Sequence, residues 1–193
     1  MKIIDARGET CPVPVILLKK ALAEANGEDI REIVDNELSK QNLEKMLNEL
    51  GHPFETTEEN GSYAVHVKLS GEEGKTVQEK PKQDSLLVLS SDQMGRGEEE
   101  LGHTLIKNFL YALTESDSLP QKIVLYNAGV KLACGDHEAV GDLKKLADKG
   151  VQIFACGLCL NYYGLAEKLQ VGSVTNMYSI IQMKFAAAKI IQL

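Results

Sequence analysis

The sequence predicts an α/β protein built from two units. Short apolar runs suited to strands alternate with longer runs of helical periodicity along the chain. Residues 70–84 are rich in charge, Gly and Pro, contain Val77 as their only large apolar residue, and separate two apolar regions. The chain has 193 residues, of which 44% are hydrophobic, and this is enough for two modest cores.

The first unit, residues 1–69, is predicted to have the order βαβαββ. Ser39 is a suitable N-cap residue for its second helix, and Gly51 is a suitable residue after the end of that helix. Residues 63–69 alternate with a period of two, as a half-buried strand does. We therefore expect an α+β sandwich of two layers, with both helices on one face of a four-stranded sheet. The expected strands are 2–5, 30–34, 53–57 and 63–69, and the expected helices are 12–25 and 39–50.

Residues 70–84 are interpreted as a flexible linker; a long surface loop within one domain is the less common alternative.

The second unit, residues 85–193, alternates strands and helices, which predicts a parallel sheet with helices on both faces, in three layers. Reactive groups gather at the carboxyl ends of such strands. The expected strands are 85–89, 123–126, 151–155 and 171–174, and the expected helices are 98–113, 139–149, 160–169 and 175–191.

Composition narrows the class of protein. No run of 18 apolar residues exists, so no membrane span is expected, and the chain starts with a strand pattern rather than a signal peptide. Both features point to the cytoplasm, where thiols stay reduced. Four cysteines in that setting indicate chemistry or metal binding rather than disulfides. These are Cys11, Cys134, Cys156 and Cys159.

The net charge of −7 is spread unevenly. Residues 1–69 hold 8 basic and 13 acidic residues, a balance of −5, whereas residues 85–193 have a balance of −1. Direct nucleic-acid binding is not expected, because affinity for phosphate comes largely from Lys and Arg. An acidic protein can instead be steered toward a basic face of a partner protein.

Cys11 stands where the first helix begins, with Pro12 and Pro14 in the first turn. The first amides of a helix lack internal partners and its dipole is positive there, so a thiol in this place tends toward a lowered pKa. Proline suits this turn because it has no N–H to lose. Arg7 is close enough in sequence to add positive charge. The alternative is that Cys11 is a small buried hydrophobic residue at the helix start.

This stretch resembles the TusA/SirA family of small sulfur-carrier proteins over residues 1–69. The matching positions are Asp5, Arg7, Gly8, Cys11, Pro12 and Pro14. The resemblance implies that Cys11 carries a persulfide sulfur and passes it to a partner protein.

A second group of thiols, Cys156 and Cys159, follows the predicted strand 151–155 and opens a helix. This Cys-x-x-Cys has three interpretations: a redox pair, half of a metal site, or a sulfur-relay thiol with a second cysteine beside it. Tyr162 and Tyr163 are expected to pack over this helix start, where one phenol can hydrogen-bond a thiol.

The second unit resembles the DsrE-like family of sulfur-transfer domains, in residues 86–91 with the loop 95–97 and in the cysteine after strand 151–155. Related domains carry sulfur at about Cys156 or Cys159, and the choice between them stays open. The two units together resemble the YedF-type selenium-metabolism proteins. That resemblance implies a sulfur or selenium carrier.

Cys134 and His137 precede the Cys-x-x-Cys at a distance that nearly matches a zinc ribbon, but a whole helix and strand fill the interval. Without metal, Cys134 is either a third relay thiol or a small buried residue. His137 is a loop histidine that can assist a nearby thiol.

The leading hypothesis is a sulfurtransferase-like carrier that relays a persulfide or selenosulfide from Cys11 to Cys156 or Cys159, with no cofactor and no resident metal. Its expected partners are a donor such as a cysteine desulfurase, an acceptor protein, and further copies of the chain through the C-terminal unit. A thiol–disulfide oxidoreductase using Cys156 and Cys159 and a zinc-binding regulator are the alternatives.

Overall fold

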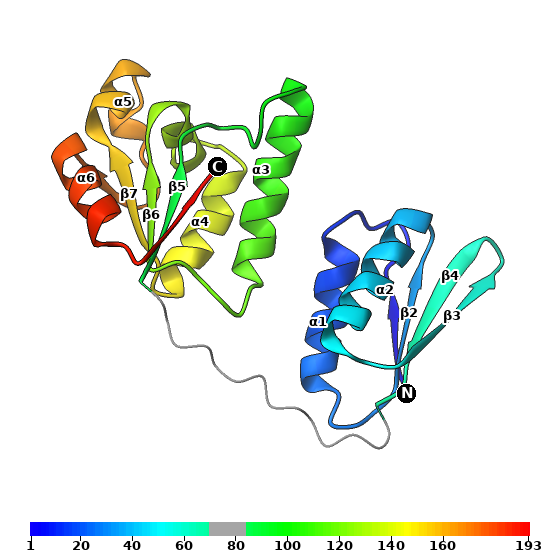
Figure 1. Cartoon of the computed structure of the whole chain (residues 1–193). Helices are drawn as coiled ribbons and strands as arrows, with labels where there is room; N and C mark the ends of the chain where they lie inside the picture. Colours follow the sequence, from blue (N-terminus) through cyan, green and yellow to red (C-terminus); the bar gives the residue numbers. More distant parts are fainter. Residues whose placement is uncertain (70–83) are drawn as a thin grey trace. The chain divides into compact units, whose positions relative to one another are not determined.

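The computed structural model describes residues 1–69 and 84–193. Of the predicted linker, residues 70–83 lie outside the described residues. The chain divides into two compact units, Met1–Gln78 and Glu79–Leu193 (Figure 1).

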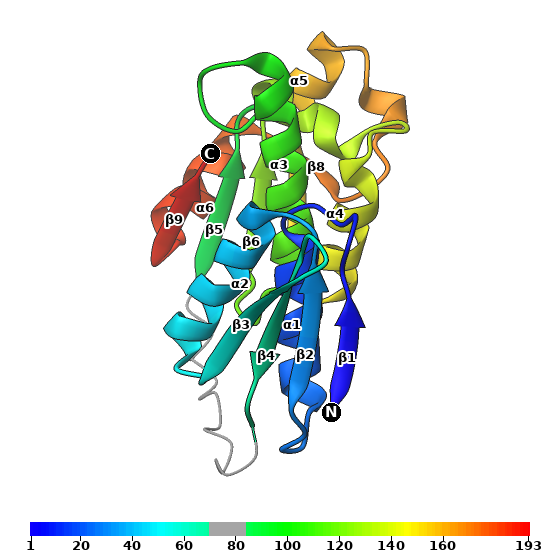
Figure 2. The same ribbon diagram turned by 90° about the vertical axis from the view of Figure 1, so that its right-hand side faces the viewer.

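The first unit has two layers, with α1 and α2 on one face of a four-stranded sheet (Figure 2). The strand order is β1-β2-β4-β3, where β1 and β2 are parallel and the other neighbours are antiparallel. Leu18, Leu43 and Val65 are among the fully buried side chains between helices and sheet. The predicted order βαβαββ is confirmed. The elements are β1 (Lys2–Asp5), α1 (Val13–Glu24), β2 (Ile30–Val34), α2 (Glu37–Leu50), β3 (Phe54–Glu59) and β4 (Ser62–Val67).

The start of α2 differs from the prediction. Asn36, not Ser39, is the N-cap residue: its Oδ1 accepts a hydrogen bond from the Ser39 amide at 2.8 Å. Asparagine caps a helix as well as serine does, so the prediction of Ser39 placed the helix start too late. Gly51 ends α2 with φ +73°, as predicted.

The second unit contains a parallel sheet of five strands in the order β8-β7-β6-β5-β9. Helices α3 and α4 lie on one face and α6 on the other (Figure 1). The predicted α/β class with a parallel sheet is confirmed. The elements are β5 (Ser85–Leu89), α3 (Glu99–Thr114), β6 (Lys122–Leu125), the 3₁₀ helix η1 (Asn127–Ala133), α4 (Ala139–Asp148), β7 (Gln152–Cys156), α5 (Gly157–Tyr162), the 3₁₀ helix η2 (Ala166–Lys168), β8 (Ser173–Thr175), α6 (Met177–Ala186) and β9 (Lys189–Gln192).

The C-terminal segment is where the predicted elements are wrong. The helix expected over residues 160–169 is the six-residue α5 followed by η2, with Gly164 at φ +65° between them. The helix expected over residues 175–191 ends at Ala186, and β9 then pairs in parallel with β5. The β-branched pair Ile190 and Ile191 favours a strand, and this preference prevails over the helical periodicity.

Candidate functional site

Cys11 lies on the loop that leaves the carboxyl end of β1, at the sheet edge where the parallel strands β1 and β2 both end. Its side chain is exposed. Pro12 is the N-cap residue of α1 and Val13 is the first helical residue. The thiol is therefore accessible at the start of the helix, and it is not packed in the core.

The first turn of α1 offers fewer free amides than its sequence suggests. The Val13 amide donates to the Thr10 carbonyl at 2.9 Å, whereas the Ile16 amide makes the first bond within the helix, to the Pro12 carbonyl at 3.1 Å. Pro14, which is buried, has no N–H. The helix dipole still favours an anion near Cys11.

Arg7 forms an ion pair with Asp5. Its Nε and Nη2 donate to the two carboxylate oxygens of Asp5 at 2.8 and 2.6 Å. Hydrogen bonds from Arg7 lower the pKa of Asp5 to about 2, and the same pairing raises the pKa of Arg7. Asp5 thus offsets much of the positive charge that Arg7 is predicted to add near Cys11.

The Cys11 loop is tied to the second strand through Gly8. Its amide donates to Asp35 Oδ2 at 2.8 Å, and its φ of +79° is a conformation that suits glycine. Asp35 follows β2 directly. This contact fixes the loop at the shared edge of β1 and β2.

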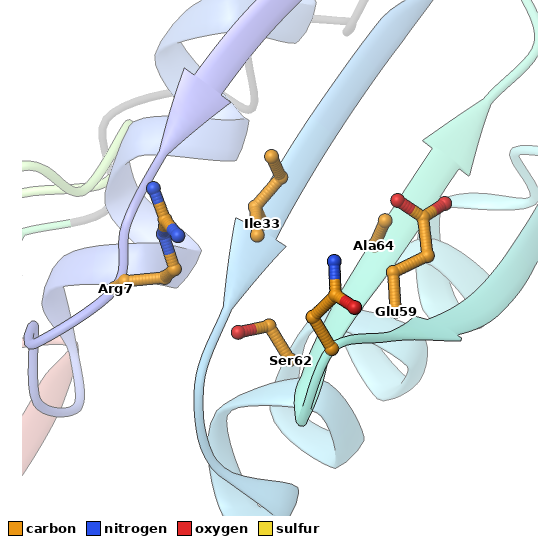
Figure 3. Close-up of a pocket in the computed structure, with 6 residues that line it drawn as sticks. Arg7, Ile33, Glu59, Ser62 and Ala64 are labelled. Atoms are coloured by element: carbon orange, nitrogen blue, oxygen red, sulfur yellow. The ribbon is translucent and has the colours of Figure 1, made fainter.

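A small hollow lies beside Arg7 on the open face of the sheet (Figure 3). Its volume is about 130 Å³, well below that of typical small-molecule sites. Cys11 is not part of its wall. The hollow therefore gives no reason to assign a small-molecule substrate to this thiol. It is lined by Arg7, Ile33, Glu59, Asn60, Ser62 and Ala64.

Cys156 and Cys159 form the second thiol group, at the carboxyl end of β7. Cys156 ends the strand and is 2% exposed, whereas Cys159 lies in α5 and is partly exposed. The Asn127 amide donates to Cys159 Sγ at 3.1 Å. Burial raises the pKa of Cys159, the hydrogen bond from Asn127 acts in the opposite direction, and the interaction with Cys156 also raises this pKa.

A chain of polar contacts continues from this thiol across three strand ends. The Tyr163 hydroxyl donates to Asn127 Oδ1 at 3.1 Å, and Lys131 Nζ lies 5.2 Å from the centre of the Tyr163 ring. Lys131 Nζ also donates to Asp92 Oδ2 at 2.9 Å. Sequence reasoning missed Asn127, Lys131 and Asp92. The rule that functional groups follow the carboxyl ends of parallel strands points to Asp92 after β5 and to Asn127 after β6.

Cys134 and His137 have contacts of their own. Cys134 is buried, its thiol donates to the Val130 carbonyl at 3.1 Å, and burial raises its pKa. His137 Nδ1 accepts from the Ala139 amide at 3.1 Å, at the start of α4, and burial lowers the pKa of His137. Within residues 1–69 and 84–193, no three His, Cys, Asp or Glu side chains are grouped as metal ligands would be. The arrangement thus lends no support to a zinc site that includes Cys134.

The first unit has the fold and the exposed cysteine of a small thiol-based carrier domain. Residues 2–69 match the family model described as sulfurtransferase TusA. A protein of Thermotoga maritima, named as a candidate sulfur carrier, is 34% identical over 71 residues, which cover 35% of this chain and 90% of that protein. The chain therefore belongs to the TusA family of sulfur carriers, through its N-terminal unit.

Two further likenesses cover different shares of the chain. An uncharacterized protein of Methanocaldococcus jannaschii is 26% identical over 179 residues, which cover 86% of this chain but 63%, less than two thirds, of that protein. The crystal structure of a SirA-like protein from Desulfitobacterium hafniense is 43% identical, with a TM-score of 0.34, and covers 36% of this chain and 99% of that one. In the part of the chain that the structure describes, no helix is long and apolar enough to cross a membrane.

Proposed function

We propose that the chain carries sulfur as a persulfide, first on Cys11 and then on the Cys156–Cys159 pair. The observation that carries this proposal is the exposed thiol of Cys11 at the start of α1, in a unit that belongs to a sulfur-carrier family. A thiolate is the nucleophile in sulfur transfer, and an exposed one is accessible to a protein-bound donor.

The proposed relay has three steps. The Cys11 thiolate attacks the terminal sulfur of a persulfide on a donor enzyme, and the donor thiolate leaves. A thiolate of the pair then attacks the terminal sulfur of the Cys11 persulfide, and the Cys11 thiolate leaves. Finally the second thiolate of the pair attacks the sulfur atom of the cysteine that bears the persulfide. This attack forms the Cys156–Cys159 disulfide and releases hydrosulfide, and a cellular dithiol then reduces the disulfide.

The proposed donor is a cysteine desulfurase, and the proposed compartment is the cytoplasm, where thiols stay reduced. The first unit carries a charge of −5, which favours partners that present a basic face. Selenium follows the same steps as a selenosulfide. Its support is the resemblance of the two-unit chain to YedF-type proteins, including a DsrE-like second unit.

A thiol–disulfide oxidoreductase is the second candidate function. The Cys-x-x-Cys spacing, with Cys156 at the end of β7 and Cys159 in the following α5, favours it, because this spacing permits a disulfide. This function requires a reduction potential near the cytosolic poise. A potential far outside that range, measured against a glutathione buffer, would exclude it.

The test of the proposed function is labelling by a cysteine desulfurase supplied with ³⁵S-cysteine. Cys11→Ala is expected to abolish labelling of the first unit, because the accepting sulfur is gone. Cys134→Ala is the matched control and is expected to label as the natural chain does, since Cys134 is buried. Full labelling of the Cys11→Ala protein would refute the proposal.

A further inference from the structure

We infer that Cys159 is the thiol of the pair that accepts sulfur, that Cys156 resolves the resulting persulfide, and that Asn127 and Tyr163 position Cys159 for the transfer. This inference rests on the proposed function and assigns the roles within its second site. The accepting step forms a bond between Cys159 Sγ and the terminal sulfur on Cys11. It breaks the S–S bond of the Cys11 persulfide, and Cys11 leaves as a thiolate.

Accessibility separates the two thiols. Transfer from a protein-bound persulfide needs direct contact between two sulfur atoms. Cys156 lies within the sheet, paired in register with Thr175 of β8, and only 2% of its surface is exposed. Cys159 lies one turn further along α5 and is partly exposed. A persulfide on another surface thus reaches Cys159 first, and Cys156 is placed behind it to attack next.

Asn127 holds Cys159 through its backbone. Its φ of +51° is a left-handed conformation that Asn tolerates better than most residues, and its amide donates to Cys159 Sγ at 3.1 Å. An N–H donor aimed at sulfur favours the thiolate over the thiol. This bond therefore opposes the effect of burial on the nucleophile.

The side chain of Asn127 is held as well. Its Oδ1 accepts from the Tyr163 hydroxyl at 3.1 Å, so one residue contacts both ends of the segment from Cys159 to Tyr163. Lys131 Nζ lies over the Tyr163 ring and also bonds Asp92, which is almost fully buried. Tyr163 is thus fixed by a cation above its ring and an acceptor at its hydroxyl, and it in turn fixes Asn127.

The experiment measures iodoacetamide alkylation of each cysteine in the full chain, by peptide mass mapping between pH 6 and 10. Tyr163→Phe keeps the ring and its contact with Lys131 but removes the hydroxyl. In this variant we expect the curve of Cys159 alkylation rate against pH to move to higher pH. The rate at neutral pH is expected to be about threefold to tenfold lower, the range for one hydrogen bond. Tyr162→Phe makes the same change on the exposed neighbour and is expected to stay within about twofold of the natural chain.

Asn127→Gly is the second variant, because glycine keeps the left-handed backbone and the amide but removes Oδ1. We expect it to slow the alkylation of Cys159 as Tyr163→Phe does. The double variant is expected to be no slower than either single one, since both changes remove the same bond. Equal curves for Tyr163→Phe and Tyr162→Phe would overturn the positioning role.

Sulfur loading by inorganic tetrasulfide tests the assignment of the two cysteines. We expect Cys156→Ser to retain one extra sulfur on Cys159, and Cys159→Ser to show none on Cys156. Loading of Cys156 in the Cys159→Ser protein, at the rate of the natural pair, would overturn the assignment. Neither experiment depends on Cys11. Failure of Cys11 to accept sulfur would therefore refute the proposed function, but it would not change the outcome of these two experiments.

Discussion

Arg7 and Asp5 form a two-pronged ion pair, with bonds of 2.8 and 2.6 Å, on the segment that leads to Cys11. Asp5→Asn removes the negative charge that pairs with Arg7, four residues before the thiol, and leaves the weaker attraction between Arg7 and Asp35. We expect alkylation of Cys11 at pH 7 to become roughly twofold to fivefold faster, the range for one exposed charge. This rate is measured by quenching the alkylation at set times and mapping the Cys11 peptide by mass spectrometry.

Salt and a matched ion pair provide the controls. The acceleration is expected to vanish in 1 M salt, where charges are screened within about 3 Å. Glu24→Gln breaks the exposed pair with Lys2 and is expected to leave the Cys11 rate unchanged. An unchanged or slower rate in Asp5→Asn would contradict the role given to Arg7.

Glu32 predicts an unusual pH dependence of stability in the first unit. Its side chain is fully buried in β2, both carboxylate oxygens lack a hydrogen-bond partner among the described residues, and burial raises its pKa to about 8. The folded state therefore holds a proton that the unfolded chain releases near pH 4.5, and stability falls as pH rises from there to about 8. We expect the melting temperature of the first unit to fall by roughly 10 °C or more between pH 5 and pH 8.

Glu32→Gln removes the titrating group and is expected to flatten this dependence in scanning calorimetry of the full chain. Glu9→Gln, at an exposed position, is the matched control and should keep the slope of the natural chain. A stability that rises between pH 5 and pH 8 would show that Glu32 is ionised in the folded protein.

Gly129 lies in η1, between the two residues that reach toward Tyr163. A Cβ on Gly129 would overlap the carbonyl oxygen of Leu89, which is backbone and does not move aside as a flexible side chain can. Gly129→Ala is expected to lower the free energy of unfolding by about 1–3 kcal/mol, the usual cost of overpacking. Gly141→Ala, in α4 with open space around it, is expected to raise that energy by about 0.5–1 kcal/mol. Urea unfolding compares the two, and an equal effect of both changes would contradict this account of η1.

An apolar surface on α6 predicts self-association of the chain. This surface consists of Met177, Tyr178, Ile181 and Phe185, all exposed. Phe185 is 86% exposed, and monomers rarely leave large apolar groups together in solvent. We expect light scattering to give a mass of more than one chain, and Phe185→Glu to reduce it to a single chain. Leu38→Glu, at an exposed apolar site of the first unit, is expected to leave the mass unchanged. A monomeric natural chain would rule out this interface.

The position of the thiols was predictable because local signals determine it. A strand followed by Cys-Pro-x-Pro places Cys11 at a helix start, and a strand followed by Cys-x-x-Cys places Cys156 at a sheet edge. Neither inference needs knowledge of distant parts of the chain.

The contacts around the two thiol sites, and strand β9, were not predictable in the same way. The hydrogen bond between Tyr163 and Asn127 joins residues 36 apart and depends on a left-handed asparagine. The pairing of Arg7 with Asp5 depends on how the loop turns. Strand β9 was missed because its place beside β5 is set by a partner about 100 residues away, as the bond from the Leu193 amide to the Val88 carbonyl illustrates.

A time course of sulfur location in the full chain tests the central proposal most directly. A Cys156→Ser chain, which is expected to keep the transferred sulfur on Cys159, is mixed with a cysteine desulfurase and cysteine, quenched at intervals, and mapped for peptides that have gained one sulfur atom. The proposed relay predicts that the Cys11 peptide gains sulfur first, that the Cys159 peptide follows, and that Cys11→Ala abolishes both. Sulfur that appears on Cys159 at an undiminished rate in the Cys11→Ala protein would contradict the relay.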